Sequence, residues 1–182
     1  MRVTERAHQV VSEVVEPGEC VIDATAGNGH DTLFLAKLVG AQGQVLAFDV
    51  QESAIESTQR RLAAAGINDE RVSLIRASHA SLQDHCTGPV AAVMFNLGYL
   101  PGSDRQLTTT SEVTLQAIAA AWSALREGGI LSVVCYRGHK GGAEEAKAVT
   151  AFANALEGAR VEIIGQQETD DGPFLVAITK ER

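Results

Sequence analysis

The sequence predicts a Rossmann-like α/β fold, in which a seven-stranded, mostly parallel sheet ends in an antiparallel hairpin and carries helices on both faces. Short apolar runs of strand length alternate with longer stretches of helical periodicity. The strand runs are apolar on successive positions, which is typical of strands covered on both faces. No helical pattern separates the last two runs. The length of 182 residues fits one sizeable core, so we expect a single domain over residues 1–182.

Seven runs have the length and composition of buried strands: residues 20–24, 45–49, 72–76, 90–95, 130–136, 161–164 and 174–178. Strand–helix alternation through the first five implies right-handed crossovers and parallel pairing. The connector over residues 166–172 is polar and rich in turn-forming residues. We therefore expect residues 160–165 and 173–179 to pair as an antiparallel hairpin.

Helical periodicity precedes the first run and fills four of the five intervals between the first six runs. We expect a first helix capped by Thr4, followed by helices over residues 31–39, 53–65, 111–125 and 143–156. The helix over 53–65 ends at Gly66, which is a good stop signal. The helix over 111–125 is expected to end at the pair Gly128 and Gly129.

Composition restricts the classes of function. The net charge of −8 opposes nonspecific binding to nucleic acid, which needs a positive field, but a locally basic site remains compatible with it. The three cysteines are far apart and form no CxxC pair, so we expect neither a metal site nor a disulfide framework. No apolar run approaches a membrane span and no secretory signal is evident, so we expect a cytoplasmic protein without a membrane partner.

The first predicted strand runs into a glycine loop, Asp23-Ala-Thr-Ala-Gly-Asn-Gly-His-Asp31. Its two glycines let the backbone turn sharply and approach a ligand closely, and the next helix offers unpaired N–H groups. A dinucleotide-binding loop would carry a third glycine where this chain has Thr32. The carboxylate of Asp31 would repel a pyrophosphate, but it suits an ammonium group, such as the methionine end of S-adenosylmethionine, and Asp23 can act in the same way.

Polar residues also follow the second and third predicted strands. Asp49 lies about twenty residues beyond the loop, where a carboxylate accepts hydrogen bonds from both ribose hydroxyls. Ser78 and His79 lie where an adenine ring would be reached, and Gln51 can line the rim. Together with the loop, these residues form the expected cofactor site: Asp23, Thr25, Gly27, Asn28, Gly29, Asp31, Thr32, Asp49, Gln51, Ser78, His79, Asn96 and Gly98.

The fourth predicted strand ends in Asn96-Leu-Gly-Tyr-Leu-Pro-Gly102, which resembles the Asn-Pro-Pro-Tyr motif of methyltransferases that modify amino nitrogens. In-line methyl transfer requires the nitrogen lone pair to point at the methyl carbon. The Asn96 side chain and the Leu97 carbonyl can hold the hydrogens of a neutral amine and aim that lone pair. Tyr99 can stack on a flat base, so we expect Asn96 and Tyr99 to be catalytic. The structural alternative is an Asn that caps the strand end and a Tyr that packs.

A third cluster, Tyr136-Arg-Gly-His-Lys-Gly-Gly142, follows the fifth predicted strand at the same edge of the sheet. Arg137 and Lys140 can meet phosphate, and His139 can take a proton or contact substrate. With Arg105 and His79 they would form a basic rim, unless the cluster is only a solvated glycine turn. The residues expected to contact substrate are Tyr99, Pro101, Arg105, Arg137, His139 and Lys140.

Four motifs in order resemble the small bacterial proteins long labelled rRNA methylases: residues 23–32, 48–51, 96–102 and 136–142. The resemblance covers almost the whole chain and implies a class I methyltransferase that uses S-adenosylmethionine and releases S-adenosylhomocysteine. It further implies a tRNA methyltransferase of the MnmM type, which methylates the aminomethyl group of the wobble 2-thiouridine. The tRNA anticodon arm is then the expected partner, and a homodimer would widen the surface that grips it.

Other functions compete with this interpretation. Methylation of rRNA or of a small-molecule amine is the main alternative, and the acidic net charge favours a small acceptor. A noncatalytic module that keeps the fold is disfavoured by the intact set Asp49, Asn96 and Tyr99. A dehydrogenase is disfavoured by Thr32 in place of the third glycine.

Overall fold

The computed structural model describes residues 1–68, 70–98, 111–138, 140–165 and 172–182. Within these residues, seven strands form one sheet in the order β3-β2-β1-β4-β5-β7-β6. Their bounds are β1 Cys20–Asp23, β2 Gln44–Asp49, β3 Val72–Arg76, β4 Val90–Asn96, β5 Leu125–Cys135, β6 Ala159–Ile164 and β7 Phe174–Lys180. Strands β1 to β5 pair in parallel, and β7 lies antiparallel between β5 and β6. The predicted fold class and the antiparallel hairpin are confirmed.

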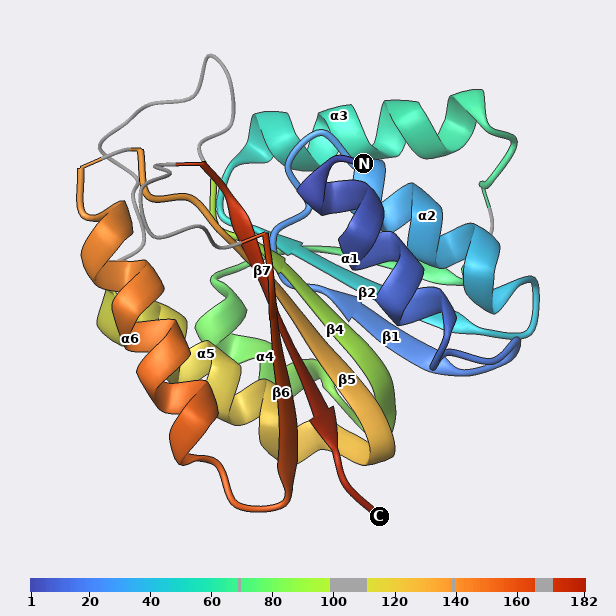
Figure 1. Cartoon of the computed structure of the whole chain (residues 1–182). Helices are drawn as coiled ribbons and strands as arrows, with labels where there is room; N and C mark the ends of the chain where they lie inside the picture. The colour runs from blue at the N-terminus through green and yellow to red at the C-terminus, as the bar shows by residue number, and fades with distance from the viewer. Residues whose placement is uncertain (69, 99–110, 139, 166–171) are drawn as a thin grey trace.

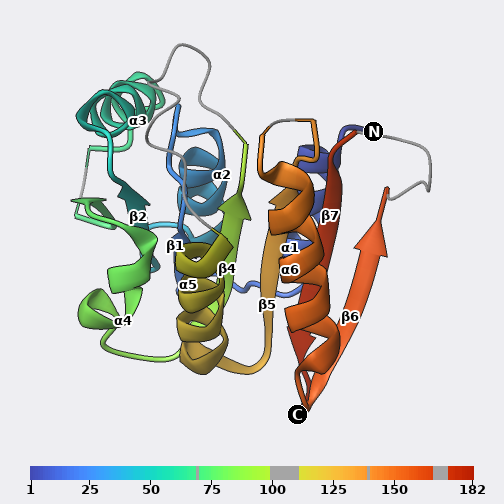
Figure 2. The same ribbon diagram turned by 90° about the vertical axis from the view of Figure 1, so that its left-hand side faces the viewer.

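Helices cover both faces of the sheet (Figures 1 and 2). Helices α1 Val3–Ser12, α2 His30–Val39 and α3 Glu52–Ala64 lie on one face. Helices α4 Leu82–His85, α5 Ser111–Ala124 and α6 Gly142–Ala155 lie on the other. Each face buries its own apolar cluster, one built around Val21, Leu35 and Val45 and the other around Phe48, Phe95 and Ile118. All residues of β4 except the last are buried, which explains why that strand is apolar without alternation.

Several predicted helix boundaries differ from the observed ones, and two of these differences have a structural cause. Helix α1 begins at Val3, so Thr4 lies inside it, and Arg2 is the residue that caps it. The backbone N–H of Arg2 donates to Glu5 Oε2 at 2.8 Å, so a carboxylate at the third helical position completes this end of the helix. Helix α5 ends at Ala124, because Leu125 already pairs with Val90 as the first residue of β5.

Gly128 and Gly129 lie inside β5 and not at a helix end. The register between β4 and β5 shifts between Val90 and Ala92, and Gly128 there adopts a φ of +71°. A Cβ on Gly129 would lie 3.0 Å from the carbonyl oxygen of Ala91. The glycine pair therefore makes a bulge in the strand, a role that the sequence pattern does not distinguish from a helix stop.

One short segment has no counterpart among the predicted elements. A 3-10 turn, His79–Ser81, leads directly into the four-residue helix α4. Ser78 caps this turn, because its hydroxyl accepts a hydrogen bond from the Ala80 N–H at 3.2 Å. Segments this short carry too little periodicity to be predicted. In the part of the chain that the structure describes, no helix is long and apolar enough to cross a membrane.

Candidate functional site

The glycine loop lies at the carboxyl edge of the sheet, between β1 and α2, which is where ligands bind in open α/β sheets. Its backbone is held by hydrogen bonds from the Ala26 N–H to the Phe48 carbonyl at 2.8 Å and from the Gly29 N–H to the Ala26 carbonyl at 2.7 Å. Gly27 and Gly29 have φ values of +53° and +75°. A Cβ on Gly29 would lie 2.8 Å from the Thr58 Cα in α3. Glycine is therefore required at this position both for the turn and for the approach of α3.

Asp49 lies against the loop from the end of β2. Its Oδ2 accepts the Gly27 N–H at 2.9 Å, and its Oδ1 accepts the Gln51 N–H at 2.9 Å. Each carboxylate oxygen has a second lone pair, so the group can still accept from two ribose hydroxyls. The sequence predicted the ribose role, but it did not indicate that Asp49 also braces the loop.

Asp23 differs from its expected role, because its side chain is fully buried beneath the loop. One oxygen accepts the Thr25 N–H at 3.0 Å and the other accepts the Thr32 hydroxyl at 2.6 Å. Burial, followed by the negative charge of Asp31, raises the pKa of Asp23 to about 7, and the bonds from Thr32 and Thr25 oppose that rise. Because its side chain is fully buried, Asp23 does not present its carboxylate to an ammonium group as expected, and the same role for Asp31 stays a prediction.

Asp31 has a partner that the sequence did not reveal. The Nε2 atom of His8, from helix α1, lies 2.6 Å from Asp31 Oδ1. The His8 ring stacks on Phe34 with centroids 3.9 Å apart and planes within 1°. The side chain of His8 is 29% exposed, whereas that of Asp31 is only 11% exposed. Helix α1 therefore contributes a side chain to the edge of the glycine loop.

His79 lies inside the protein, so it cannot belong to a charged rim as expected. Its ring is 6% exposed and meets Phe95 edge-on, with the centroids 5.7 Å apart. Its Nδ1 lies 3.2 Å from the Ala24 carbonyl oxygen, and its buried Nε2 has no hydrogen-bond partner among the residues that the structure describes. Burial lowers the pKa of His79, although the Ala24 carbonyl and the charge of Asp49 act in the opposite direction. Neutral His79 thus supports the floor of the loop.

The predicted acceptor motif follows β4. The Asn96 backbone N–H donates to the Thr25 hydroxyl at 2.8 Å. The side-chain carboxamide of Asn96 takes no part in this hydrogen bond. The Leu97 N–H donates to the Val134 carbonyl at 2.9 Å, and Leu97 is buried. Gly98 is exposed and follows at once. These bonds fix the end of β4 between β1 and β5.

Tyr136 also lies at this edge of the sheet, although its place in the sequence did not mark it as a site residue. A Cβ on Gly98 would lie 3.0 Å from Tyr136 Cε2, so the ring packs directly against the glycine. Burial, followed by the charge of Asp31, raises the pKa of Tyr136, while a hydrogen bond with the Asn96 side chain opposes the rise. The available signal was its position at the end of β5, the neighbour of β4.

Two of the residues expected to contact phosphate lie in different surroundings. The Arg137 guanidinium lies 5.2 Å from the centre of the Phe174 ring, and its Nη2 donates to the Gly172 carbonyl at 3.5 Å. Arg137 is thus half-buried against β7 and does not extend into solvent, whereas Lys140 is exposed. Four further expected residues lie outside the described residues: Tyr99, Pro101, Arg105 and His139.

The sequence is similar to a known protein family and to a plant protein. Residues 45–179 match the family described as Putative rRNA methylase. The tRNA (mnm(5)s(2)U34)-methyltransferase of Arabidopsis thaliana chloroplasts is 43% identical over 164 residues, which cover 85% of this chain. Those residues cover 60% of the plant protein, so this chain matches less than two thirds of it.

Two crystal structures match over nearly the full length of both chains. A putative rRNA methylase from Clostridium thermocellum is 39% identical with a TM-score of 0.94, and the match covers 99% of this chain and 98% of that one. A putative methyltransferase from Streptococcus mutans, solved in complex with SAH (S-adenosylhomocysteine), is 36% identical with a TM-score of 0.86 and the same coverage.

The buried carboxyl of Asp23 predicts a specific pH dependence of stability. Because its pKa is raised from 3.8 to about 7 on folding, the folded protein holds a proton that the unfolded chain has lost. Its contribution to the free energy of unfolding is therefore present below about pH 4 and is lost as pH rises to about 7, with a slope of at most about 1.4 kcal/mol per pH unit.

The variant Asp23→Asn should remove this slope, because an amide can accept from Thr25 and donate to the Thr32 hydroxyl without ionising. Urea unfolding of both proteins between pH 4 and 8 measures the difference. Asp84→Asn, which alters an exposed carboxylate of α4, is the matched control and should keep the wild-type slope. Parallel curves for wild type and Asp23→Asn would contradict the assignment.

Proposed function

Because the chain belongs to the Putative rRNA methylase family, we propose that it binds S-adenosylmethionine at the glycine loop and methylates an amine of tRNA. The amine is the aminomethyl group of the wobble 2-thiouridine in the anticodon arm. The observation that carries the proposal is Asp49 braced against the glycine loop at the carboxyl edge of the sheet. The Streptococcus mutans relative with SAH, 36% identical over its length, supports the cofactor.

The residues present fit the cofactor in both charge and space. The positive φ values of Gly27 and Gly29 shape the turn of the loop, and Asp49 retains lone pairs for a ribose. Asp31 provides a carboxylate for an ammonium group at the N-terminal end of α2. When bound, S-adenosylmethionine supplies a methyl group on a positively charged sulfur, which a neutral amine can attack.

The acceptor amine would be positioned by the end of β4. The Asn96 side-chain oxygen and the Leu97 carbonyl can each accept a hydrogen from the amine, which directs its lone pair toward the methyl group. Tyr136 holds the Asn96 carboxamide by a hydrogen bond and closes one side of the position with its ring. Tyr99 is proposed to stack on the base. The amine has to lose its extra proton before it attacks, since a protonated amine has no lone pair.

We propose a tRNA substrate because the chain is 43% identical to the plant tRNA (mnm(5)s(2)U34)-methyltransferase. This substrate presents an aliphatic amine beside a flat base. Asn96 can accept hydrogen bonds from such an amine, and the aromatic residue that follows, Tyr99, can stack on the base. A small-molecule amine is the second candidate, and the net charge of −8 favours it, because a negative protein repels RNA unless a basic site attracts it.

The direct test is methyl transfer from labelled S-adenosylmethionine to tRNA that lacks the final wobble methyl group, followed by mass spectrometry of the nucleosides. We expect label in 5-methylaminomethyl-2-thiouridine. Transcribed tRNA without the aminomethyl group is the control and should gain no label. If the cofactor binds but no tRNA nucleoside gains a methyl group, the tRNA proposal fails and small amines become the better candidates.

Two substitutions should separate the acceptor from the cofactor. Asn96→Ala keeps the backbone bond to Thr25, so cofactor affinity should stay nearly unchanged while kcat falls on the order of 10²-fold through misplacement of the amine. Asp49→Ala should instead raise the cofactor Kd, because both the ribose contact and the brace on Gly27 are lost. Calorimetry and single-turnover kinetics measure the two effects. A cofactor Kd raised equally in both variants would reassign Asn96 to the cofactor pocket.

Tyr136→Phe tests the positioning role of the tyrosine hydroxyl. The phenyl ring keeps the contact with Gly98, so only the hydrogen bond to Asn96 is removed. Loss of about 1.4 kcal/mol at the transition state would lower kcat about tenfold, with KM for the cofactor unchanged. An unchanged kcat, or a loss confined to KM, would contradict the role.

A further inference from the structure

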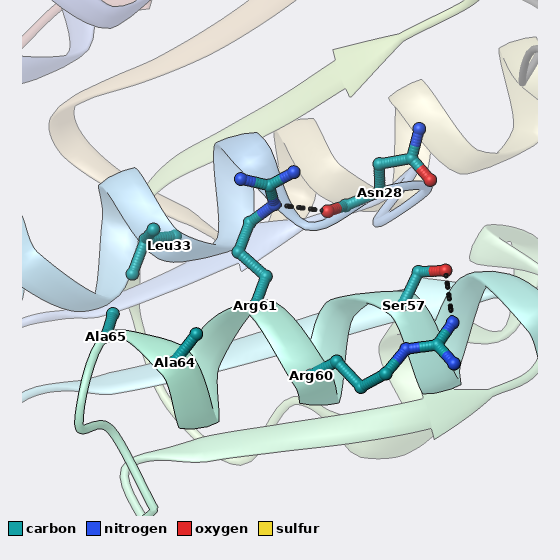
Figure 3. Close-up of a pocket in the computed structure, with 7 residues that line it drawn as sticks. All are labelled: Asn28, Leu33, Ser57, Arg60, Arg61, Ala64 and Ala65. Carbon is teal, nitrogen blue, oxygen red and sulfur yellow. Dashed lines mark hydrogen bonds between the residues drawn. The ribbon is translucent and has the colours of Figure 1, made fainter.

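A surface hollow of about 520 Å³ lies between α2 and α3, directly beside the glycine loop (Figure 3). One end is formed by the small apolar surface of Leu33, Ala64 and Ala65, and the other by Asn28 and Ser57. The guanidinium groups of Arg60 and Arg61, both from α3, border it. None of the residues that line it carries a carboxylate, although the chain has 23 Asp and Glu residues and a net charge of −8.

Hydrogen bonds to groups other than carboxylates hold the two arginines in place. Arg61 Nε donates to the Asn28 carbonyl at 2.6 Å, and its Nη2 lies 3.0 Å from His30 Nε2. Arg60 Nη2 donates to the Ser57 hydroxyl at 3.2 Å. Among the residues that the structure describes, no carboxylate forms an ion pair with either guanidinium. Neither positive charge at the hollow is therefore paired with a carboxylate of the described part of the chain.

This arrangement is suited to a phosphate group. A guanidinium has five N–H donors in a planar fork, and the contacts above use two of them on Arg61 and one on Arg60. The remaining donors match phosphate oxygens, and fixed side chains lose less entropy when they bind. The N-terminal end of α2, which starts at His30, adds a positive dipole beside Asn28.

We propose that the hollow bordered by Arg60 and Arg61 binds a backbone phosphate of the RNA whose base enters the acceptor site. This inference rests on the proposed function, since it assumes an RNA substrate. An anticodon arm is much larger than the loop that holds the cofactor, so its backbone has to cross neighbouring surface. Asn28, which lines one end of the hollow, belongs to the glycine loop. The hollow is therefore part of the surface next to the loop that the RNA backbone would cross. It would supply the local attraction that the acidic chain as a whole lacks.

The test is tRNA binding to the enzyme loaded with S-adenosylhomocysteine, measured by fluorescence anisotropy over a series of KCl concentrations. Arg60→Gln removes a charge without touching the glycine loop. We expect it to weaken tRNA binding several-fold at 0.1 M KCl and to reduce the salt slope by about 0.7 to 0.9, the value for one phosphate contact. The Kd for S-adenosylhomocysteine should not change. Arg60→Glu should weaken tRNA binding further.

Arg160→Gln is the matched control, because it removes an equal charge from β6, at the opposite edge of the sheet. It should leave the salt slope at the wild-type value. Equal effects of the Arg60 and Arg160 substitutions, or none from either, would overturn the proposal. If wild type methylates tRNA while Arg60→Gln binds it normally, this inference fails and the proposed function stands. If wild type neither binds nor methylates tRNA, both fail.

A binding measurement with a mononucleotide distinguishes a site for RNA from a site for a free phosphate compound. AMP at constant ionic strength should bind the wild-type hollow weakly or not at all, since the proposal requires the rest of the RNA to add its contacts. If Arg60→Gln abolished binding of AMP but left tRNA binding unchanged, the hollow would be a site for a free nucleotide, and the RNA proposal would be overturned.

Discussion

The candidate site depends on the hydrogen bonds that hold the glycine loop between β2 and α3. The Gly27 N–H donates to Asp49, and the Gly27 carbonyl accepts from the Thr58 hydroxyl at 3.2 Å. Both backbone polar groups of Gly27 are thus held by side chains from outside the loop. Gly29 lets α3 approach until its backbone is in contact. Because the loop is prearranged by protein groups, a ligand that binds there does not have to order it, which lowers the entropic cost of binding.

The same network joins the cofactor side to the acceptor side. Asp23, buried below the loop, accepts from Thr25, and the Thr25 hydroxyl accepts from Asn96 at the end of β4. Tyr136 then links the Asn96 side chain to the end of β5. Three adjacent strand ends are therefore connected through side chains, so the distance between the glycine loop and the proposed acceptor position is set by the sheet and not by the loops alone.

The fold was predictable from the sequence, since apolar runs on successive positions mark strands buried on both faces and the missing last helix marks the hairpin. Residues at strand ends were also predictable, because parallel strands place them at one edge. The orientation of side chains was not. Nothing in the sequence distinguishes Asp23, which is fully buried, from Asp31, which stays 9% exposed, or connects His8 with Asp31, 23 positions away. Gly128 and Gly129 form a bulge and not a helix stop, because pairing of Leu125 with Val90 outweighs the local pattern.

The acidic balance of the chain and an RNA substrate are compatible for a physical reason. In 0.15 M salt, exposed charges separated by more than about 8 Å are largely screened from each other. A phosphate therefore responds mainly to the groups in its own neighbourhood, and two guanidinium groups without a carboxylate partner among the described residues line the α2–α3 hollow. Elsewhere the excess of acidic side chains repels RNA and disfavours nonspecific complexes. An acidic protein with a small basic site thus gives up general affinity for RNA and keeps affinity for RNA that is correctly oriented.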